Sequence, residues 1–559
     1  MSTAGHIVGA ALRFLLAVVR DVVILAGRER MAALVVFALL AALVLFWKIT
    51  LGRHGQGWRR VRSIRFRLWL HLRPGPGFAS LPELWLRWGR LAALSYGARS
   101  RPGLGLFARL TLPTAEFAVR LGRAQYRRRL YAAFELHCLI LAPPRTDKTG
   151  LLADRIIRHP GPALTTSTRA DLHQLTSPVR RGRGPVYVFN PELVGDVPSN
   201  FVWDLLGVCT DELMAYKIAD WLAGGTPDYG DLAWFEEVGV LGLSGLLLAA
   251  SMTGASLADV YTWTQRRGHE RALAALAAHG NPELHAAVRA LMEENNKTAA
   301  SIRTTIARAL KWAVIPQLAA AVDRCGTFNA REFALEGGTL HLIASGDSRS
   351  VITPLLRALA SYVHYEAGLA GSRTEAGRLD PPLLMAMDEV AQVCPVDLPS
   401  MLADSAGKGV VFVTVAHSLA KLEERYGAEG AANIWAISGV KMLLRGITEP
   451  QTLEDVSRVC GTLGDDDDET RIVPPDVLRR LPKHCALVIN MDLSPAVVRV
   501  SRAWQRRGAR RAARWNAVPW QLTETVPPDL RDLPEASADL ADTVAFPAVP
   551  RPPAPRSER

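Results

Sequence analysis

Cysteine is scarce in this chain, with six residues in 559, and no two of them share a C-x-x-C spacing. A disulfide-stapled fold and a structural zinc site are therefore excluded, and we expect reduced thiols. Aromatic residues are also few, at 7%, but hydrophobic residues make up 49% and charged residues only 21%. This composition excludes a wholly disordered protein, and the length predicts two or three globular domains.

Acidic residues are almost missing from one stretch of the chain. Residues 48–129 contain 18 Lys and Arg but only two acids, Glu83 and Glu116, which gives a net charge of +16. Because the whole chain carries +12, the remainder carries −4. The excess positive charge directly follows the longest apolar run, and this placement suggests a membrane before it suggests DNA.

Long apolar runs are rare, and the longest one predicts a transmembrane helix. Residues 31–47 contain no charge, glycine or proline, and they are followed by Lys48. Residues 7–26 are a weaker candidate, because Arg13, Arg20 and Asp21 interrupt them; they would form a second span or an interfacial helix. We therefore expect a membrane anchor in residues 1–50.

The basic segment 51–130 is predicted to lie next to the membrane, where its arginines and tryptophans would contact anionic lipid. Single-stranded DNA could use the same mixture of side chains, and both alternatives stay open. Positive charge on this side of the anchor predicts a cytoplasmic location for the long C-terminal part, and hence a protein of the inner (plasma) membrane.

Further along, short apolar runs alternate with helical stretches, which predicts an α/β domain with a parallel sheet buried on both faces. We assign this domain to residues 131–204 and 336–524. The intervening residues 205–335 are rich in Ala and Leu and predict an inserted all-helical domain, and residues 525–559 predict a disordered tail rich in Pro and Ala. The predicted strands are 137–142, 162–167, 185–189, 339–344, 383–388, 409–415, 440–444 and 486–490.

The first predicted strand leads into APPRTDKTG, residues 142–150, and then into a helical sequence. Its spacing matches the phosphate loop G-x-x-x-x-G-K-[ST], in which backbone amides and a lysine hold phosphate oxygens and the hydroxyl binds Mg²⁺. Both glycines are missing, and Ala142 and Asp147 take their places. The candidate nucleotide-binding residues are Ala142, Arg145, Asp147, Lys148, Thr149 and Gly150.

A second motif supports this interpretation. The apolar strand PLLMAMDE ends in two adjacent carboxylates, Asp388 and Glu389. In P-loop NTPases such a strand presents an Asp that holds Mg²⁺ and a Glu that orients the attacking water. We therefore predict metal binding by Thr149 and Asp388 and a catalytic role for Glu389.

Together these motifs resemble the TraG/TraD group of type IV secretion coupling proteins, from about residue 135 to 500. The most specific stretch is MAMDEVAQVCPVDLPSMLADSAGKGVVFVTVAHSLAKLEERYG, residues 385–427. Other stretches that carry the resemblance are APPRTDKTG, ALTTSTRADL, VYVFNP, AWFEE and GGTLHLIA.

The resemblance implies a RecA-like P-loop NTPase domain with an inserted all-α domain, preceded by an N-terminal transmembrane anchor and assembling as a homo-hexamer. It also implies ATP and Mg²⁺ as cofactors. The implied partners are DNA, single-stranded or bound to a relaxase, the relaxosome and type IV secretion components, and the membrane. His417 stands where the family has a glutamine that senses the γ-phosphate, and a neutral imidazole could donate the same hydrogen bond.

Asp147 is the departure with the largest expected consequence. A carboxylate about 4 Å from a phosphate oxygen costs roughly 1 kcal/mol in water and about 4 kcal/mol in a partly buried site. We expect weakened nucleotide binding unless the carboxylate turns outward or pairs with Arg145. The first hypothesis is a DNA-translocating coupling ATPase; the alternatives are a scaffold of the same fold that recruits substrate without hydrolysis, and an FtsK-like DNA translocase.

Overall fold

The computed structural model describes residues 75–505, except 225–230, 295, 323, 325, 327, 347–349 and 464–469. The predicted membrane segments 7–26 and 31–47 and the predicted tail 525–559 lie outside the described residues. Within the described part, no helix is both long enough and apolar enough to cross a membrane. The five cysteines described there are unpaired and buried, as expected of reduced thiols.

One mixed sheet forms the centre of the described residues, and its strand order is β2-β1-β13-β12-β9-β3-β8-β7-β4-β6-β5. Each of the eight predicted strands is present, with bounds that agree within two residues. The strands are β1 Val119–Arg123, β2 Arg129–Ala132, β3 Cys138–Leu141, β4 Ala163–Ser167, β5 Val186–Phe189, β6 Thr339–Ile343, β7 Leu383–Asp388, β8 Val410–Ala416, β9 Val440–Leu444, β12 Cys485–Asn490 and β13 Leu493–Arg499.

The seven strands from β9 to β5 in this order are parallel and buried on both faces. In β3, for example, Leu139 and Leu141 join the larger core cluster, whereas Cys138 and Ile140 join the second cluster on the opposite face. Successive side chains of a strand point to opposite faces, so most positions of such a strand are apolar, and buried polar residues such as Thr165 and His341 are hydrogen-bonded to each other, 2.7 Å. This is why the central strands could be recognised as continuous apolar runs.

The other end of the sheet differs from the prediction of an all-parallel sheet. Strand β12 pairs antiparallel with both β9 and β13, and β1 pairs antiparallel with β2 and β13. The sheet therefore begins at Val119, inside the segment 51–130 predicted as a juxtamembrane region. The hairpin β1–β2 was missed because its sequence is rich in arginine, and only Leu121 and Gly122 of β1 and the apolar part of β2 are buried.

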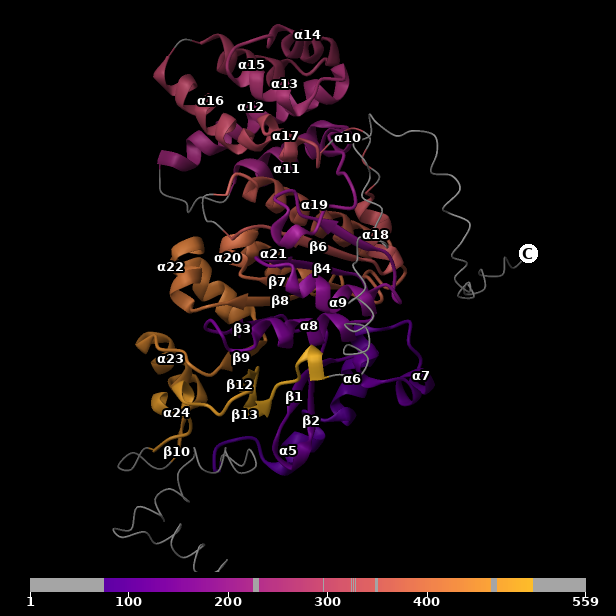
Figure 1. The fold of residues 1–559 in the computed structure, drawn as a ribbon, viewed down its shortest axis with the longest axis vertical. Helices are drawn as coiled ribbons and strands as arrows, with labels where there is room; N and C mark the ends of the chain where they lie inside the picture. The colour runs from indigo at the N-terminus through magenta and orange to yellow at the C-terminus, as the bar shows by residue number, and fades with distance from the viewer. Residues whose placement is uncertain are drawn as a thin grey trace, which may run out of the picture.

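Helices cover both faces of the sheet (Figure 1). The second core cluster is covered by α8 Lys148–Arg158 and α9 Asp171–Arg180, which contribute Leu151, Leu152, Ile156 and Leu172. The larger cluster is covered by α18 Ala330–Glu336, α19 Thr353–Ser372, α20 Val390–Val393, α21 Leu398–Ser405 and α22 Leu419–Ile437.

The described residues between β5 and β6 contain helices, as the sequence predicts for the insert. The central helix is α12 Asp231–Thr253, where Gly242 and Gly245 pack so closely that a Cβ would lie 2.3 and 2.4 Å from side chains of α15. Helix α11 connects this bundle to α19 on the sheet (Figure 1). The helices of the insert are α10 Leu205–Val208, α11 Glu212–Ala223, α13 Leu257–Thr264, α14 Glu270–His279, α15 Pro282–Glu293, α16 Lys297–Ala309 and α17 Pro316–Ala319.

Smaller elements lie at the antiparallel end of the sheet. The N-terminal group consists of α5 Leu81–Leu86, α6 Arg90–Ser100 and α7 Leu106–Thr111. A C-terminal group consists of α23 Pro450–Cys460, α24 Pro475–Arg479 and the two-stranded ribbon of β10 Thr462–Leu463 and β11 Thr470–Arg471.

Candidate functional site

The predicted site residues come together at the carboxyl ends of three adjacent strands. Strand β8 lies between β3 and β7 in the sheet, so the segments that follow these three strands meet at one edge. Residues 142–150 follow β3, the acidic pair ends β7, and His417 follows β8. The topology thus brings together residues that are up to 275 positions apart in the sequence.

The loop before α8 adopts a shape that normally requires glycine. Asp147 has φ 66° and ψ 23°, in the left-handed region, and Arg145 has φ 63°. A non-glycine residue in this region is strained by about 1–3 kcal/mol. The turn is held by hydrogen bonds from Thr146 Oγ1 to the Pro143 carbonyl oxygen, 2.6 Å, and from the Leu151 amide to the Asp147 carbonyl oxygen, 3.2 Å.

The carboxylate of Asp147 points away from the amides at the start of α8. Aspartate is a preferred helix N-cap, yet this side chain makes no capping hydrogen bond. Its Oδ2 lies 2.5 Å from His484 Nδ1 and 3.4 Å from Arg502 Nη1. The carboxylate has therefore turned outward, one of the two arrangements considered above, but its partners are His484 and Arg502 rather than Arg145.

Lys148 is held between the two carboxylates of the acidic pair. Its Nζ forms an ion pair with Glu389 Oε1 and lies 3.5 Å from Asp388 Oδ1. Asp388 is only 4% exposed, and burial raises the pKa of its carboxyl to about 6. Glu389, at φ 50°, keeps its charge because hydrogen bonds from His417 and Lys148 lower its pKa to about 2.

His417 bridges the phosphate loop and the acidic pair. Its Nδ1 lies 3.2 Å from the Ala142 carbonyl oxygen, and its Nε2 lies 3.2 Å from Glu389 Oε1. The hydrogen bond to Glu389 raises the pKa of His417. That His417 donates a hydrogen bond to the γ-phosphate as a neutral imidazole stays a prediction.

The remaining predicted residues also lie at this edge of the sheet. Ala142 is buried at the end of β3, and its amide donates to the Ala416 carbonyl oxygen, 2.9 Å, so a Cβ is accommodated where the motif has glycine. Thr149 and Gly150 belong to the first turn of α8, and Arg145 is exposed. All nine residues that the sequence analysis named as candidate site residues therefore lie at the same edge of the sheet.

Three residues near this region were not predicted: His484, Arg502 and Trp504. They precede β12 or follow β13, more than 330 positions after the loop. No spacing rule connects them to the loop, and only the antiparallel end of the sheet places them beside Asp147 and Gly150. The positive φ of His484, 62°, is visible in the structure alone.

The residues present fit a divalent cation bound together with phosphate oxygens. Asp388 Oδ1 is buried and makes no hydrogen bond among the described residues, with only Lys148 Nζ facing it at 3.5 Å, and the Thr149 hydroxyl lies on the neighbouring first turn of α8. A carboxylate and a hydroxyl oxygen are ligands that suit Mg²⁺, which is usually bound by one or two protein groups plus phosphates. Thr149 and Asp388 therefore remain the candidate metal ligands.

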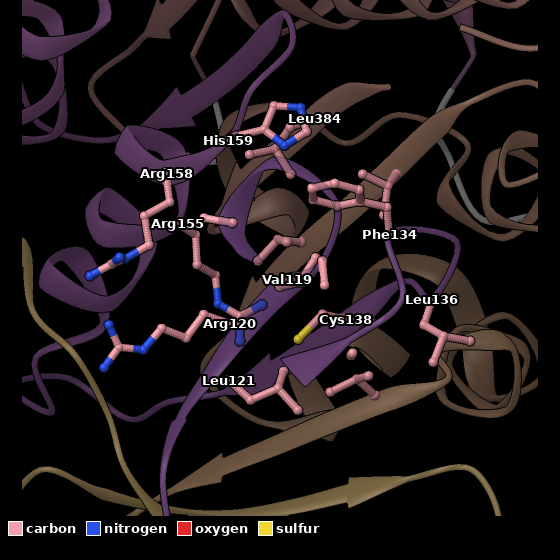
Figure 2. A pocket seen from close by; sticks show the side chains of 16 residues that line it. Val119, Arg120, Leu121, Phe134, Leu136, Cys138, Arg155, Arg158, His159 and Leu384 are labelled. Atoms are coloured by element: carbon pink, nitrogen blue, oxygen red, sulfur yellow. The ribbon is translucent and has the colours of Figure 1, made fainter. Parts of the chain in front are cut away.

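A separate cavity lies further along α8, between this helix, the hairpin β1–β2 and the sheet (Figure 2). Its walls include Cys138, Phe134 and Val413, together with Arg120, Arg155 and Arg158. Arg155 is 5% exposed, and its Nε and Nη1 have no hydrogen-bond partner among the described residues. This cavity is not part of the phosphate-loop region.

The described residues form a mixed α/β sheet domain that carries a helical insert. Solved structures share this fold. The bacterial conjugative coupling protein TrwBΔN70 in complex with sulphate is 19% identical, with a TM-score of 0.53, and the alignment covers 66% of this chain and 86% of that chain. At such identities the likeness establishes the fold alone.

Two further TrwB structures contain nucleotides. The complex with the non-hydrolysable ATP analogue ADPNP is 18% identical, with a TM-score of 0.53 and coverage of 65% of this chain and 85% of that chain. The complex with ADP and Mg²⁺ is 19% identical, with a TM-score of 0.50 and coverage of 66% and 87%.

Residues 382–483 match the protein family described as the TraM recognition site of TraD and TraG. No curated protein sequence matches the chain. The family match and the shared fold confirm the resemblance to TraG/TraD-type coupling proteins.

Proposed function

We propose that this protein is a coupling ATPase of a conjugation or type IV secretion system, which binds Mg-ATP and uses it to recruit and move DNA or nucleoprotein. The observation that carries the proposal is the conformation of Asp147. The loop keeps its glycine-like shape, the amides at the start of α8 are not capped by a side chain, and the carboxylate faces two basic residues instead of the phosphate position. A helix N-terminus with free amides favours phosphate binding.

Each residue of the site then has a distinct role. Lys148, which pairs with Glu389, would hold the β- and γ-phosphate oxygens of a bound nucleotide. Thr149 and Asp388 would hold Mg²⁺, which would supply stabilisation of the negative charge on the phosphates. Release of Lys148 frees Glu389 to accept a hydrogen bond from the attacking water. His417, which contacts both Glu389 and the loop, is placed to respond to the γ-phosphate.

The wider assembly is proposed from the family resemblance. TraM recognition is the described property of the family that matches residues 382–483, which supports relaxosome-type partners. TrwB is described as a conjugative coupling protein, which supports DNA transfer as the process served. Anchoring in the inner membrane through residues 1–50, contact of segment 51–130 with lipid or DNA, and assembly into a homo-hexamer belong to the same proposal.

A scaffold that recruits substrate without hydrolysing ATP is the second candidate. It is favoured by the presence of Asp147 at the position where the motif has glycine. The two candidates differ in turnover, because the scaffold would bind partners but not consume ATP. An FtsK-like translocase is less favoured, since the family match to residues 382–483 belongs to TraD and TraG.

The test is calorimetric titration of the full-length protein with Mg-ATP, followed by a phosphate-release assay. We expect binding in the parent and an affinity lower by about 10- to 100-fold in Lys148→Ala, because a charge-assisted contact to phosphate is lost. The matched control is Lys421→Ala, which removes an exposed lysine that pairs with Glu424 on α22. Equal affinities in parent and Lys148→Ala would contradict the proposed site, and binding without phosphate release would favour the scaffold.

A further inference from the structure

Trp504 lies directly against the start of the phosphate-loop helix. The chain leaves β13, passes Arg502 and enters a short 3-10 turn, Ala503–Gln505, which packs next to α8. Figure 1 shows the yellow end of β13 beside α8. Ala503 is fully buried in the same core cluster as Leu151 and Leu152 of α8, so the position of the turn is fixed by the core.

Gly150 permits this close contact. A Cβ built on Gly150 would lie 2.2 Å from the Trp504 ring, so any other residue at this position would displace the tryptophan. Glycine is unfavourable inside a helix, because it loses more backbone entropy than other residues. Its presence in the first turn of α8 is explained by the contact with the indole ring.

The contact leaves much of the tryptophan open to solvent. Trp504 is 37% exposed, although its neighbour Ala503 is buried. The Arg502 guanidinium lies 5.7 Å from the centre of the ring and also faces the Asp147 carboxylate. The exposed ring of Trp504 is thus connected to the loop by two contacts. It packs directly on Gly150, and it lies beside Arg502, which faces Asp147 of the loop.

We propose that Trp504, supported by Arg502, is the platform on which the base of a bound purine nucleotide stacks. This inference rests on the proposed function, because it requires phosphates at the amides of residues 148–150. A nucleotide held there by its phosphates must extend its sugar and base past the first turn of α8. Trp504 offers a flat aromatic surface at this turn, and aromatic side chains stack on bases independently of hydrogen bonding.

The experiment separates binding of the base from binding of the phosphates. Full-length parent protein, Trp504→Ala and Trp504→Phe are titrated with Mg-ATP and with Mg-tripolyphosphate, which has the phosphates but no base. We expect Trp504→Ala to weaken ATP binding by about 10-fold and to leave tripolyphosphate binding within about twofold, whereas Trp504→Phe keeps most of the ATP affinity.

The chain offers a matched control in Trp85→Ala. Trp85 is 53% exposed, and the Arg128 guanidinium lies 5.7 Å from its ring centre, which is the same arrangement on α5. This variant should bind both ligands like the parent.

If Trp504→Ala binds ATP as tightly as the parent, the proposal that Trp504 stacks on the base is wrong, but the proposed phosphate-binding site is not contradicted. Tighter binding would also overturn it, because the ring would then be an obstruction. If the parent binds neither ligand, the proposed function fails and the platform with it.

Discussion

At the scale of single residues, the molecule tolerates an aspartate in the phosphate loop because other residues compensate for it. His484 and Arg502 face the carboxylate of Asp147 on the outer side of the loop, and the positive charge of Arg502 reduces the repulsion that a phosphate would meet. The backbone strain of about 1–3 kcal/mol remains. We therefore expect nucleotide binding that is weaker than that of a loop with both glycines.

A second consequence at this scale concerns Glu389, whose carboxylate forms an ion pair with Lys148. Glu389→Gln removes the charge that competes for the lysine and repels the γ-phosphate. We predict tighter Mg-ATP binding and a turnover lower by about 100-fold or more, as expected when the group that orients the attacking water is lost. Titration calorimetry and a phosphate-release assay measure both effects. Glu424→Gln on the exposed face of α22 is the control, and unchanged turnover in Glu389→Gln would remove this residue from the catalytic role.

At the scale of elements, α8 has two parts: its first turn belongs to the candidate site, and its last turns pack against the sheet and the hairpin β1–β2. The packed part includes Arg155, a buried cation without a partner for two of its nitrogens among the described residues (Figure 2). A buried charge without full hydrogen bonding destabilises a fold, and an apolar side chain of similar volume is often more stable at such a site.

We therefore predict that Arg155→Met raises the free energy of unfolding by about 1–3 kcal/mol, as measured by urea denaturation followed by circular dichroism. Arg158→Met is the matched comparison one turn later. Arg158 Nε donates to Oδ2 of the buried Asp154, 2.8 Å, so its removal should lower stability. A loss of stability in Arg155→Met would show that the guanidinium is satisfied by solvent in the cavity.

At the scale of the whole molecule, the two core faces contain histidines that are buried in the neutral form. Burial lowers the pKa of His137, His173 and His364 to about 4 and that of His159 to about 3, and it lowers the pKa of His341 well below its usual value. The unfolded chain has ordinary histidines with a pKa of about 6.5. Stability from these groups is present above pH 6.5 and is lost as the pH falls towards 4.

The free energy of unfolding should therefore fall between pH 7 and pH 5, by about 2 kcal/mol for each such histidine. Urea denaturation at half-unit pH intervals measures the slope. His364→Gln should reduce this slope by up to one proton. A stability that does not depend on pH over this range would contradict the burial of neutral histidines in the core.

The amino-acid sequence by itself determined the parallel part of the sheet and the central residues of the candidate site. The strands from β3 to β9 are mostly buried and therefore mainly apolar, and the phosphate-loop and acidic-pair motifs are local in sequence. Lys148, Thr149, Asp388, Glu389 and His417 could be named for that reason, and the structure brings them together.

Only the tertiary structure decided the antiparallel end of the sheet and its contribution to the site. The hairpin β1–β2 and strand β13 are partly exposed or rich in arginine, so their periodicity is weak, and β12 could not be assigned a direction from its apolar sequence alone. The outward turn of Asp147 depends on His484 and Arg502, and the surface beside Gly150 depends on Trp504. These contacts join residues more than 330 positions apart, and burial in a common core, rather than local sequence, holds them in place.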